Sequence, residues 1–276
     1  DYMIARLIEE DMLQKLDYSK IPNYEKIGEQ YKNLSFDPNN EYSVPYTWGT
    51  LGIIYNTTMV DEPITSWDAL FDPKYAGQVL MINNPRDALA TALMSLGYSI
   101  NTQDEGEIRE AYERLAQAKA DGVYQSFVAD EVYDKMEAGE AAIAVYYAGD
   151  FLSMHENNPS LRWAVPENGS NWFVDAMCVL ADAQHKEEAE AWINFICSTS
   201  SSLANMDYIW YASPNSQALE EYPDYYYETY GEEMDPDLYS IMAAPADVLA
   251  RCEAYEALPP AIDTLYKDLW TELGIG

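Results

Sequence analysis

Between residues 78 and 154 the chain alternates short apolar runs with longer amphipathic ones, and this alternation constrains the fold more than any other feature. QVLMIN (78–83) and AAIAVYY (141–147) have the length and composition of buried strands. Helical patterns are found at 105–120 and 129–138. Strands that alternate with helices predict a sheet covered by helices, so we expect an α/β protein.

The helix after QVLMIN has the clearest local signals. Asn84 is a good N-cap, Pro85 suits the first helical position, and the apolar stripe of the helix stops before Gly97. These signals place Asp87 in the first turn. An acid there is also favoured by the helix dipole alone, without any binding role.

Other elements are expected along the rest of the chain. The run EYSVPYTWGTLGIIYN predicts a strand in which Gly49 and Gly52 mark a bend or crossover. The tyrosine-rich stretch YPDYYYETY predicts an irregular surface loop. The remaining predictions are helices at 1–16, 65–77, 185–198 and 260–273 and a strand at 171–180.

Composition bounds the kind of protein. A length of 276 residues suits two domains, and 48% hydrophobic residues can bury a substantial core. Acids outnumber bases by 48 to 15, and the net charge of -33 repels nucleic acids and anionic membranes. We therefore expect no nucleic-acid partner. No apolar run is long enough to span a membrane.

The cysteines and histidines exclude several chemistries. Three cysteines and two histidines show no metal-binding spacing and no disulfide framework. The two histidines lie on polar stretches far apart, which argues against a Ser-His-Asp triad. We expect no metal and no cofactor.

Asp175 lies in the middle of the apolar run NWFVDAM. If this run is a strand, Phe173 and Asp175 share one face with Met177. A carboxylate among apolar side chains needs a partner, because burial of an unpaired charge costs several kcal/mol or neutralises the group.

Acids and tyrosines also stand where predicted strands end and helices begin, which is where ligands bind in α/β sheets. They are Asp87, Tyr147, Asp150, Asp175 and Tyr211. Carboxylates beside aromatic rings suit an organic cation, because acids bind an ammonium and ring faces add cation–π attraction. Asp87 and Asp150 also have a purely structural interpretation as helix-terminal acids, and Tyr211 has one as a core aromatic. Asp175, in the middle of a predicted strand, fits such an interpretation least.

The order of the segments resembles that of the spermidine/putrescine-binding proteins of polyamine ABC transporters, over nearly the whole chain. The most specific motifs are PRDALATALMSLGYS and the series AGD, PENG and the following Asp175. The resemblance implies an α/β, two-lobed fold of the periplasmic-binding-protein kind, with strand crossovers at a hinge and a ligand cleft that closes. It implies a non-enzymatic protein that captures putrescine or spermidine for import.

The expected lobes follow from the resemblance. The first comprises residues 1–50 and 175–235, and the second 51–174 and 236–276. The N-terminal strands of the family's first lobe have no counterpart in this sequence, so we expect that lobe to be incomplete.

The resemblance assigns ligand contacts residue by residue. The aromatic and the acid of the segment AGD match Tyr147 and Asp150, and the aromatic-x-Asp strand matches Phe173 and Asp175. The other matched positions, with a gapped alignment for the last, are Asp87, Tyr211, Tyr2 and Glu256. Some family members have an aspartate at Asn84 and tryptophans at Tyr147 and Phe173, so the preferred polyamine stays open.

The family also implies where the protein works and with what. We expect an extracytoplasmic monomer, periplasmic or at the cell surface, that delivers its ligand to the membrane permease of an ABC transporter. Two alternatives remain. Tyr146 and Tyr147 are a pair of hard oxygen ligands that a ferric-binding protein of the same class would use. Asp150 and Asp175 are the acid pair that a glycoside hydrolase would need.

Overall fold

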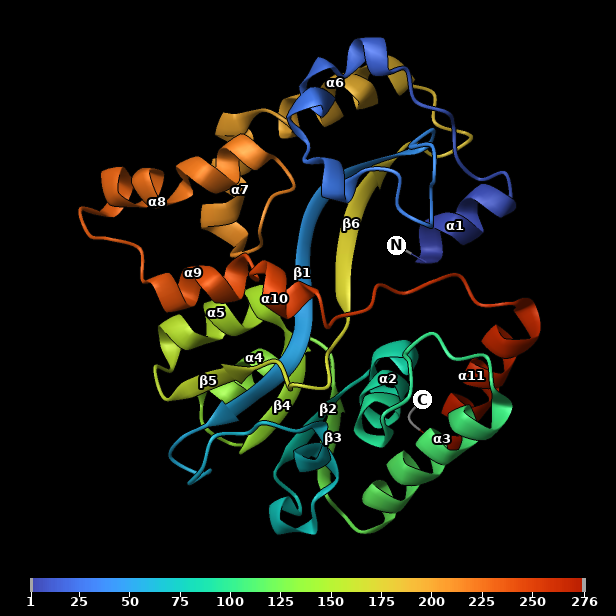
Figure 1. The fold of residues 1–276 in the computed structure, drawn as a ribbon, viewed down its shortest axis with the longest axis vertical. Helices are drawn as coiled ribbons and strands as arrows, with labels where there is room; N and C mark the ends of the chain where they lie inside the picture. The colour runs from blue at the N-terminus through green and yellow to red at the C-terminus, as the bar shows by residue number, and fades with distance from the viewer. Residues whose placement is uncertain (1, 275–276) are drawn as a thin grey trace. The chain divides into compact units, whose positions relative to one another are not determined.

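The computed structural model describes residues 2–274 and is a mixed α/β protein, as expected (Figure 1). Strands and helices alternate through the middle of the chain. The strands are β1 (Ser43–Asn56), β2 (Val79–Ile82), β3 (Tyr124–Val128), β4 (Ile143–Tyr147), β5 (Leu161–Ala164) and β6 (Trp172–Cys178). The helices are α1 (Tyr2–Glu9), α2 (Pro85–Leu96), α3 (Glu105–Ala120), α4 (Glu131–Glu137), α5 (Ala148–Asn157), α6 (Lys186–Ile196), α7 (Thr199–Ile209), α8 (Ser216–Tyr230), α9 (Pro236–Met242), α10 (Ala246–Leu249) and α11 (Pro260–Leu273).

The chain forms two compact units. Unit 1 comprises Asp1–Gly49, Phe173–Ala244 and Tyr255–Ala257, and unit 2 comprises Thr50–Trp172, Pro245–Ala254 and Leu258–Gly276. Strand β1 begins in unit 1 and ends in unit 2, so one continuous strand connects them. The change of unit falls at Gly49, where the sequence predicted a bend or crossover.

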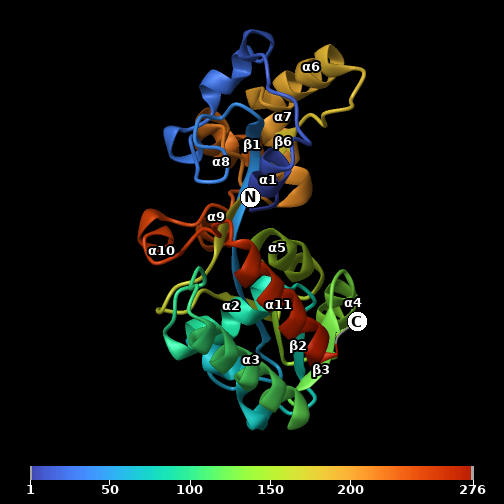
Figure 2. The ribbon, with the colours of Figure 1, turned by 90° about the vertical axis from the view of Figure 1, so that its right-hand side faces the viewer.

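Unit 2 contains a five-stranded portion of the sheet in the order β3-β2-β4-β1-β5. Strand β2 is parallel to both β3 and β4, whereas β1 is antiparallel to β4 and β5. Every residue of β2 is buried, because helices cover both faces of the sheet. Figure 1 shows α2 and α3 on one side of these strands and α4 and α5 on the other. Figure 2 shows α11 alongside α2 and α3.

Helix α2 follows its predicted boundaries. Asn84 accepts hydrogen bonds from the backbone N–H groups of Arg86 and Asp87, and Gly97 follows the last turn with a left-handed φ of 80°. Glycine adopts this conformation without steric cost, so the helix stops there. Nine consecutive residues of α2, from Arg86 to Met94, are buried.

Unit 1 contains the first half of β1 paired with β6. Single bridges extend this pairing, between Trp48 and Ala212 and between Leu13 and Leu180. Helix α1 buries Ile4, which packs in a cluster with Leu13 and Phe36. Unit 1 is thus built from chain segments that are distant in sequence.

Three predicted elements differ from the structure. The first helix ends at Glu9 and not near residue 16, because Asp11 takes a left-handed φ of 54°. The chain then extends, and the N–H of Gln14 donates to the carbonyl of Val179. The helix expected at 65–77 is two 3-10 turns, because Asp72, which precedes Pro73, is extended.

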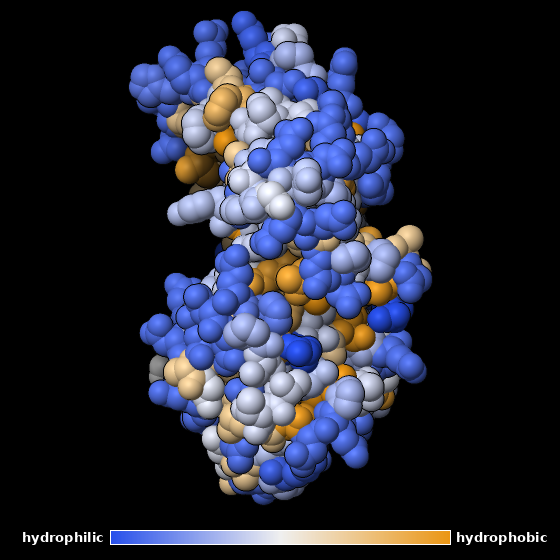
Figure 3. Space-filling model, turned by 90° about the vertical axis from the view of Figure 1, so that its left-hand side faces the viewer, coloured by the Kyte–Doolittle hydropathy of each residue, from blue (hydrophilic) through white to orange (hydrophobic). Residues whose placement is uncertain are grey.

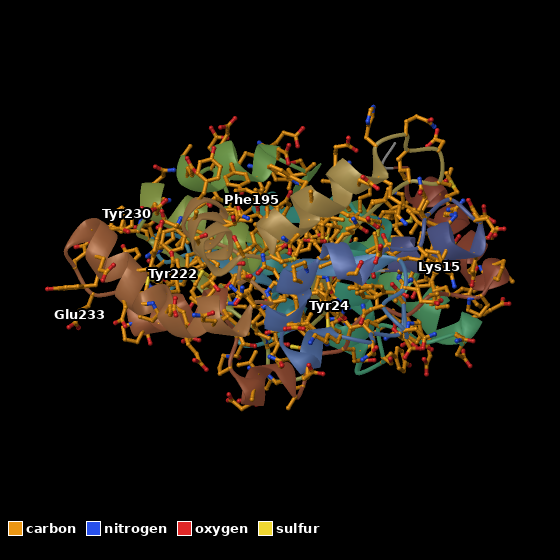
Figure 4. The ribbon with its side chains drawn as sticks, turned by 90° about the horizontal axis from the view of Figure 1, so that it is seen from above. Lys15, Tyr24, Phe195, Tyr222, Tyr230 and Glu233 are labelled. Atoms are coloured by element: carbon orange, nitrogen blue, oxygen red, sulfur yellow. The ribbon has the colours of Figure 1, made fainter. Side chains whose placement is uncertain are left out.

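The largest error concerns the tyrosine-rich stretch, which is helical and not a loop. Helix α8 includes Pro223, which cannot donate the hydrogen bond that the carbonyl of Leu219 would normally accept. The hydroxyl of Tyr239 donates to that carbonyl at 2.8 Å. Figure 4 shows Tyr222 and Tyr230 along α8, with Glu233 beyond its end.

The lobe boundaries also differ in part from expectation. Residues 173–174, 236–244 and 255–257, which we assigned to the second lobe, belong to unit 1, and Thr50 belongs to unit 2. The hydrogen bond from Tyr239 to Leu219 explains the placement of 236–244, since it attaches α9 to α8. The face drawn in Figure 3 is mainly hydrophilic over both units, in keeping with the net charge of -33.

Candidate functional site

Three parallel strands of unit 2 present polar side chains at the same edge of the sheet. Strands β2, β3 and β4 run in one direction and are followed by α2, α4 and α5. The third residue of each of these helices is Asp87, Tyr133 and Asp150, respectively. The carboxyl edge of parallel strands is where α/β sheets bind ligands.

Asp87 is buried, with 3% of its surface exposed, and is held from two directions. Its backbone N–H is capped by Asn84. The hydroxyl of Tyr147, the last residue of β4, donates a hydrogen bond of 2.6 Å to its Oδ2 atom. A charged acceptor in a low-dielectric site makes this hydrogen bond stronger than one between neutral groups.

Asp150 forms a second pair of the same kind. The hydroxyl of Tyr133 donates a hydrogen bond to Oδ1 of Asp150. Burial, followed by this hydrogen bond and the charge of Asp150, raises the pKa of Tyr133 well above its usual range. The phenol therefore stays protonated and remains a donor at physiological pH.

Tyr146 and Tyr147 form a tilted ring pair with centroids 5.1 Å apart. Burial, and then the charges of Asp150 and other nearby acids, raise the pKa of Tyr146 to about 12. The ferric alternative needs tyrosinates, and this environment favours the protonated phenol of Tyr146. Among the residues that the structure describes, no group of three or more His, Cys, Asp or Glu side chains could hold a metal ion.

In unit 1, Asp175 projects from the middle of β6. Its side chain is exposed to solvent, and it accepts a 3.3 Å hydrogen bond from the hydroxyl of Thr47 on β1. Desolvation by surrounding protein atoms raises the pKa of Asp175, although the hydrogen bond from Thr47 opposes this shift. Two causes raise the pKa of the nearby Tyr46 phenol: desolvation is the larger, and the charge of Asp175 is the smaller. The carboxylate is thus accessible yet incompletely solvated.

Phe173 and Tyr211 supply a ring pair in the same unit. Their centroids are 6.2 Å apart, with an angle of 58° between the rings. Both rings lie against the backbone of Gly49, where an added Cβ would be 3.1 Å from Phe173 and 3.3 Å from Tyr211. A side chain at position 49 would force these rings to move by a few tenths of an ångström, so the absence of a Cβ in Gly49 accommodates their close approach to β1.

Tyr2 and Glu256 belong to another part of unit 1. The ring of Tyr2 makes an edge-on contact with that of Tyr255, with centroids 5.9 Å apart. Glu256 follows Tyr255 and is exposed. Helix α1 and the 255–257 segment are therefore neighbours.

The structure places the eight predicted residues in two sets. Asp87, Tyr147 and Asp150 share the sheet edge of unit 2, and the others belong to unit 1; those others are Tyr2, Phe173, Asp175, Tyr211 and Glu256. Their role in ligand binding stays a prediction.

Sequence reasoning missed Tyr133, Tyr46 and Thr47. The position of Tyr133 after strand β3 matches that of Asp87 after β2, and this regularity is a signal in the sequence. The partnership of Thr47 with Asp175 spans 128 residues and leaves no local signal.

The fold is that of an α/β solute-binding protein. The profile of the bacterial extracellular solute-binding protein family matches residues 1–225, and the chain belongs to this family. The resemblance to spermidine/putrescine-binding proteins is confirmed by the relatives described next. The family is described as bacterial extracellular solute-binding proteins, so membership favours solute binding over the glycoside hydrolase alternative.

Similar proteins include the spermidine/putrescine-binding periplasmic protein of Salmonella typhimurium. It is 33% identical over 79% of this chain, and the chain spans 62% of its length. The putrescine-binding periplasmic protein of Pseudomonas aeruginosa is 28% identical, with coverage of 99% of this chain and 76% of the relative.

Solved structures agree with the sequence comparisons. A spermidine/putrescine ABC transporter protein from Listeria monocytogenes has a TM-score of 0.89 at 33% identity, covering 99% of this chain and 81% of that one. The spermidine/putrescine transporter substrate-binding protein of Streptococcus pneumoniae has a TM-score of 0.83 with the same identity and coverage. Among residues 2–274, no helix has the length and apolar character needed to cross a membrane.

Proposed function

We propose that this protein binds linear polyamines of the putrescine and spermidine type and delivers them to the permease of an ABC transporter. The observation that carries the proposal is the composition of the eight matched residues. Four are acids, four are aromatic, and none is a base. Such a set favours an organic cation and disfavours anions.

The chemistry of unit 2 supports an ammonium ligand. Asp87 and Asp150 each accept a hydrogen bond from a phenol. Burial, and then the charges of these and other acids, raise the pKa of Tyr146. Several carboxylates at one sheet edge create a negative potential that attracts cations. The ring of Tyr147 offers an apolar face to the methylene chain of such a ligand.

The chemistry of unit 1 supports the same class. Asp175 is accessible and incompletely solvated, so a ligand ammonium would gain more from it than from a fully hydrated carboxylate. The rings of Phe173 and Tyr211 are suited to the carbon chain. An acid beside aromatic rings suits one ammonium group of a linear polyamine. We propose Glu256 and Tyr2 as further contacts.

The named relatives support the ligand class and the transporter. Proteins from Salmonella typhimurium and Listeria monocytogenes are named for spermidine and putrescine, and the latter for an ABC transporter. A binding protein of this kind passes its ligand to a membrane permease, and we propose such a permease as the protein partner. We also propose that the protein is a monomer.

Calorimetric titration tests the proposal. The protein is titrated with putrescine, spermidine and inorganic phosphate at constant ionic strength. We expect heat of binding for the two amines and none for phosphate, because the matched residues include acids and no bases. Binding of phosphate without binding of either amine would refute the proposed ligand class.

A further inference from the structure

Tyr133 occupies the position in α4 that acids occupy in the two neighbouring helices. It is the third residue of the helix after β3, just as Asp87 and Asp150 are the third residues of α2 and α5. Because β2, β3 and β4 are parallel, these three side chains start from the same edge of the sheet. Tyr133 is therefore placed among the acids that we propose bind the ligand.

The contact of Tyr133 with Asp150 is specific to one oxygen. Its hydroxyl donates to Oδ1 of Asp150, and α4 packs directly against α5. The side chain of Tyr133 is partly buried, so its ring position is set by packing and the hydroxyl direction follows from it. The hydrogen bond fixes the rotation of the carboxylate about its last torsion, which is otherwise broad.

The surroundings of Asp150 give this donor an electrostatic role. Burial, and then the charges of Asp150, of Asp130 and Glu131 at the start of α4, and of Asp87, raise the pKa of the Tyr146 phenol. Strand β5, which also packs against α5, carries Arg162, an exposed side chain whose guanidinium donates to the carbonyls of Pro159 and Leu161. Neighbouring carboxylates make the ionised form of each acid less favourable, and a phenol donor offsets this effect.

We propose that Tyr133 is a positioning residue of the polyamine site, which holds Asp150 ionised and correctly oriented for a ligand ammonium. This inference rests on the proposed function. Tyr133 acts through Asp150, so its contribution to affinity depends on the carboxylate being present and on pH. A tyrosine that served packing alone would have neither dependence.

The first experiment compares two tyrosine-to-phenylalanine variants. Tyr133→Phe removes the donor to Asp150. Tyr124→Phe is the matched control, because the Tyr124 hydroxyl is also buried in unit 2 and has no hydrogen-bond partner among the described residues. Putrescine affinity is measured by calorimetry from pH 5 to pH 8.

We expect Tyr133→Phe to weaken putrescine binding about threefold to tenfold at pH 7, the effect of one modest hydrogen bond. The loss should grow towards pH 5, because protonation of Asp150 becomes easier without the donor. Tyr124→Phe should keep the parental affinity throughout. Parental binding by Tyr133→Phe, or a loss that is independent of pH, would overturn the inference.

The second experiment tests whether Tyr133 acts through Asp150. In an Asp150→Asn background, the further change Tyr133→Phe should leave affinity unchanged, and an equal loss in both backgrounds would contradict the inference.

A ligand-free measurement separates this inference from the proposed function. In protein labelled with ¹³C at aspartate carboxyls, the resonance lost in Asp150→Asn should titrate at higher pH in Tyr133→Phe. If the parent protein bound no amine, the proposed function would fail. If the Asp150 carboxyl titrated at the same pH in the parent and in Tyr133→Phe, the effect of Tyr133 on Asp150 would be refuted.

Discussion

The hydroxyl of Tyr147 donates a hydrogen bond to Oδ2 of Asp87, with 2.6 Å between the two oxygens. Tyr147 is the last residue of β4 and Asp87 lies in α2, so this bond connects the strand to the helix. Asp87 is almost fully buried. A buried carboxylate depends on its donors, because an unpaired charge away from water is costly.

Tyr147→Phe should therefore lower the free energy of unfolding by about 1–3 kcal/mol, the cost of leaving a buried acceptor without one of its donors. Chemical denaturation measures this change, and putrescine affinity should fall in parallel. Tyr98→Phe is the matched control, because Tyr98 donates to Glu110 at the surface of the same unit. Equal losses in the two variants would contradict the role of burial.

Asp175→Asn should weaken amine binding by about 2–4 kcal/mol, the usual cost of truncating one member of a desolvated charge pair. The fold should persist, since Asp175 is exposed and asparagine can still accept the hydrogen bond from Thr47. Calorimetry with putrescine gives the loss. Asp182→Asn, at another exposed acid of unit 1, should bind like the parent. Unchanged binding by Asp175→Asn would remove Asp175 from the site.

The same substitution should alter the pH dependence of stability without ligand. Desolvation raises the pKa of Asp175, so the folded protein binds this proton more tightly than the unfolded chain. Its charge therefore destabilises the fold above the raised pKa, and the penalty disappears as pH falls below the usual value of 3.8. Asp175→Asn should be at least as stable as the parent at pH 7, with a difference that shrinks towards pH 4. Urea unfolding at several pH values measures this difference. If desolvation did not act on Asp175, the causes that lower its pKa would dominate, and the parent would gain stability relative to Asp175→Asn as pH rises.

Gly49→Ala should disturb the rings beside β1. The new methyl group would be 3.1 Å from Phe173 and 3.3 Å from Tyr211, closer than ordinary van der Waals contact. We expect a loss of stability of about 1–3 kcal/mol, typical of overpacking, and a changed near-ultraviolet circular dichroism spectrum. Adding Phe173→Leu should recover part of the stability, because the smaller side chain makes room. No recovery would mean that the rings are not the obstacle.

Tyr239→Phe should destabilise α8, because the Leu219 carbonyl would lose its donor opposite Pro223. The expected cost is about 0.5–1.5 kcal/mol, measured by thermal unfolding. In a Pro223→Ala background, a backbone N–H can reach that carbonyl, and the same change should cost less. An equal cost in both backgrounds would mean that the hydroxyl does not substitute for the missing backbone donor.

The sequence by itself determined the elements whose signals are local. The N-cap Asn84, Pro85 and the stop at Gly97 specify α2, because capping and backbone conformation depend on adjacent residues. The apolar run of 41–56 specified β1, and the glycine at its centre marked the change of unit. Motif order gave the family, since the segments keep their order along the chain.

Tertiary structure alone decided the elements and partners that depend on distant residues. The Tyr239 hydroxyl donates to the Leu219 carbonyl, which has no backbone donor because Pro223 lies inside α8. Similarly, α1 ends early, and the extended chain after it pairs with Val179 through the N–H of Gln14. Likewise, periodicity placed Asp175 on a strand face, but Thr47, 128 residues away, became its partner through the pairing of β1 with β6. A sequence pattern states which face a side chain occupies, whereas only the folded backbone brings the hydrogen-bonding groups of separate segments within reach of one another.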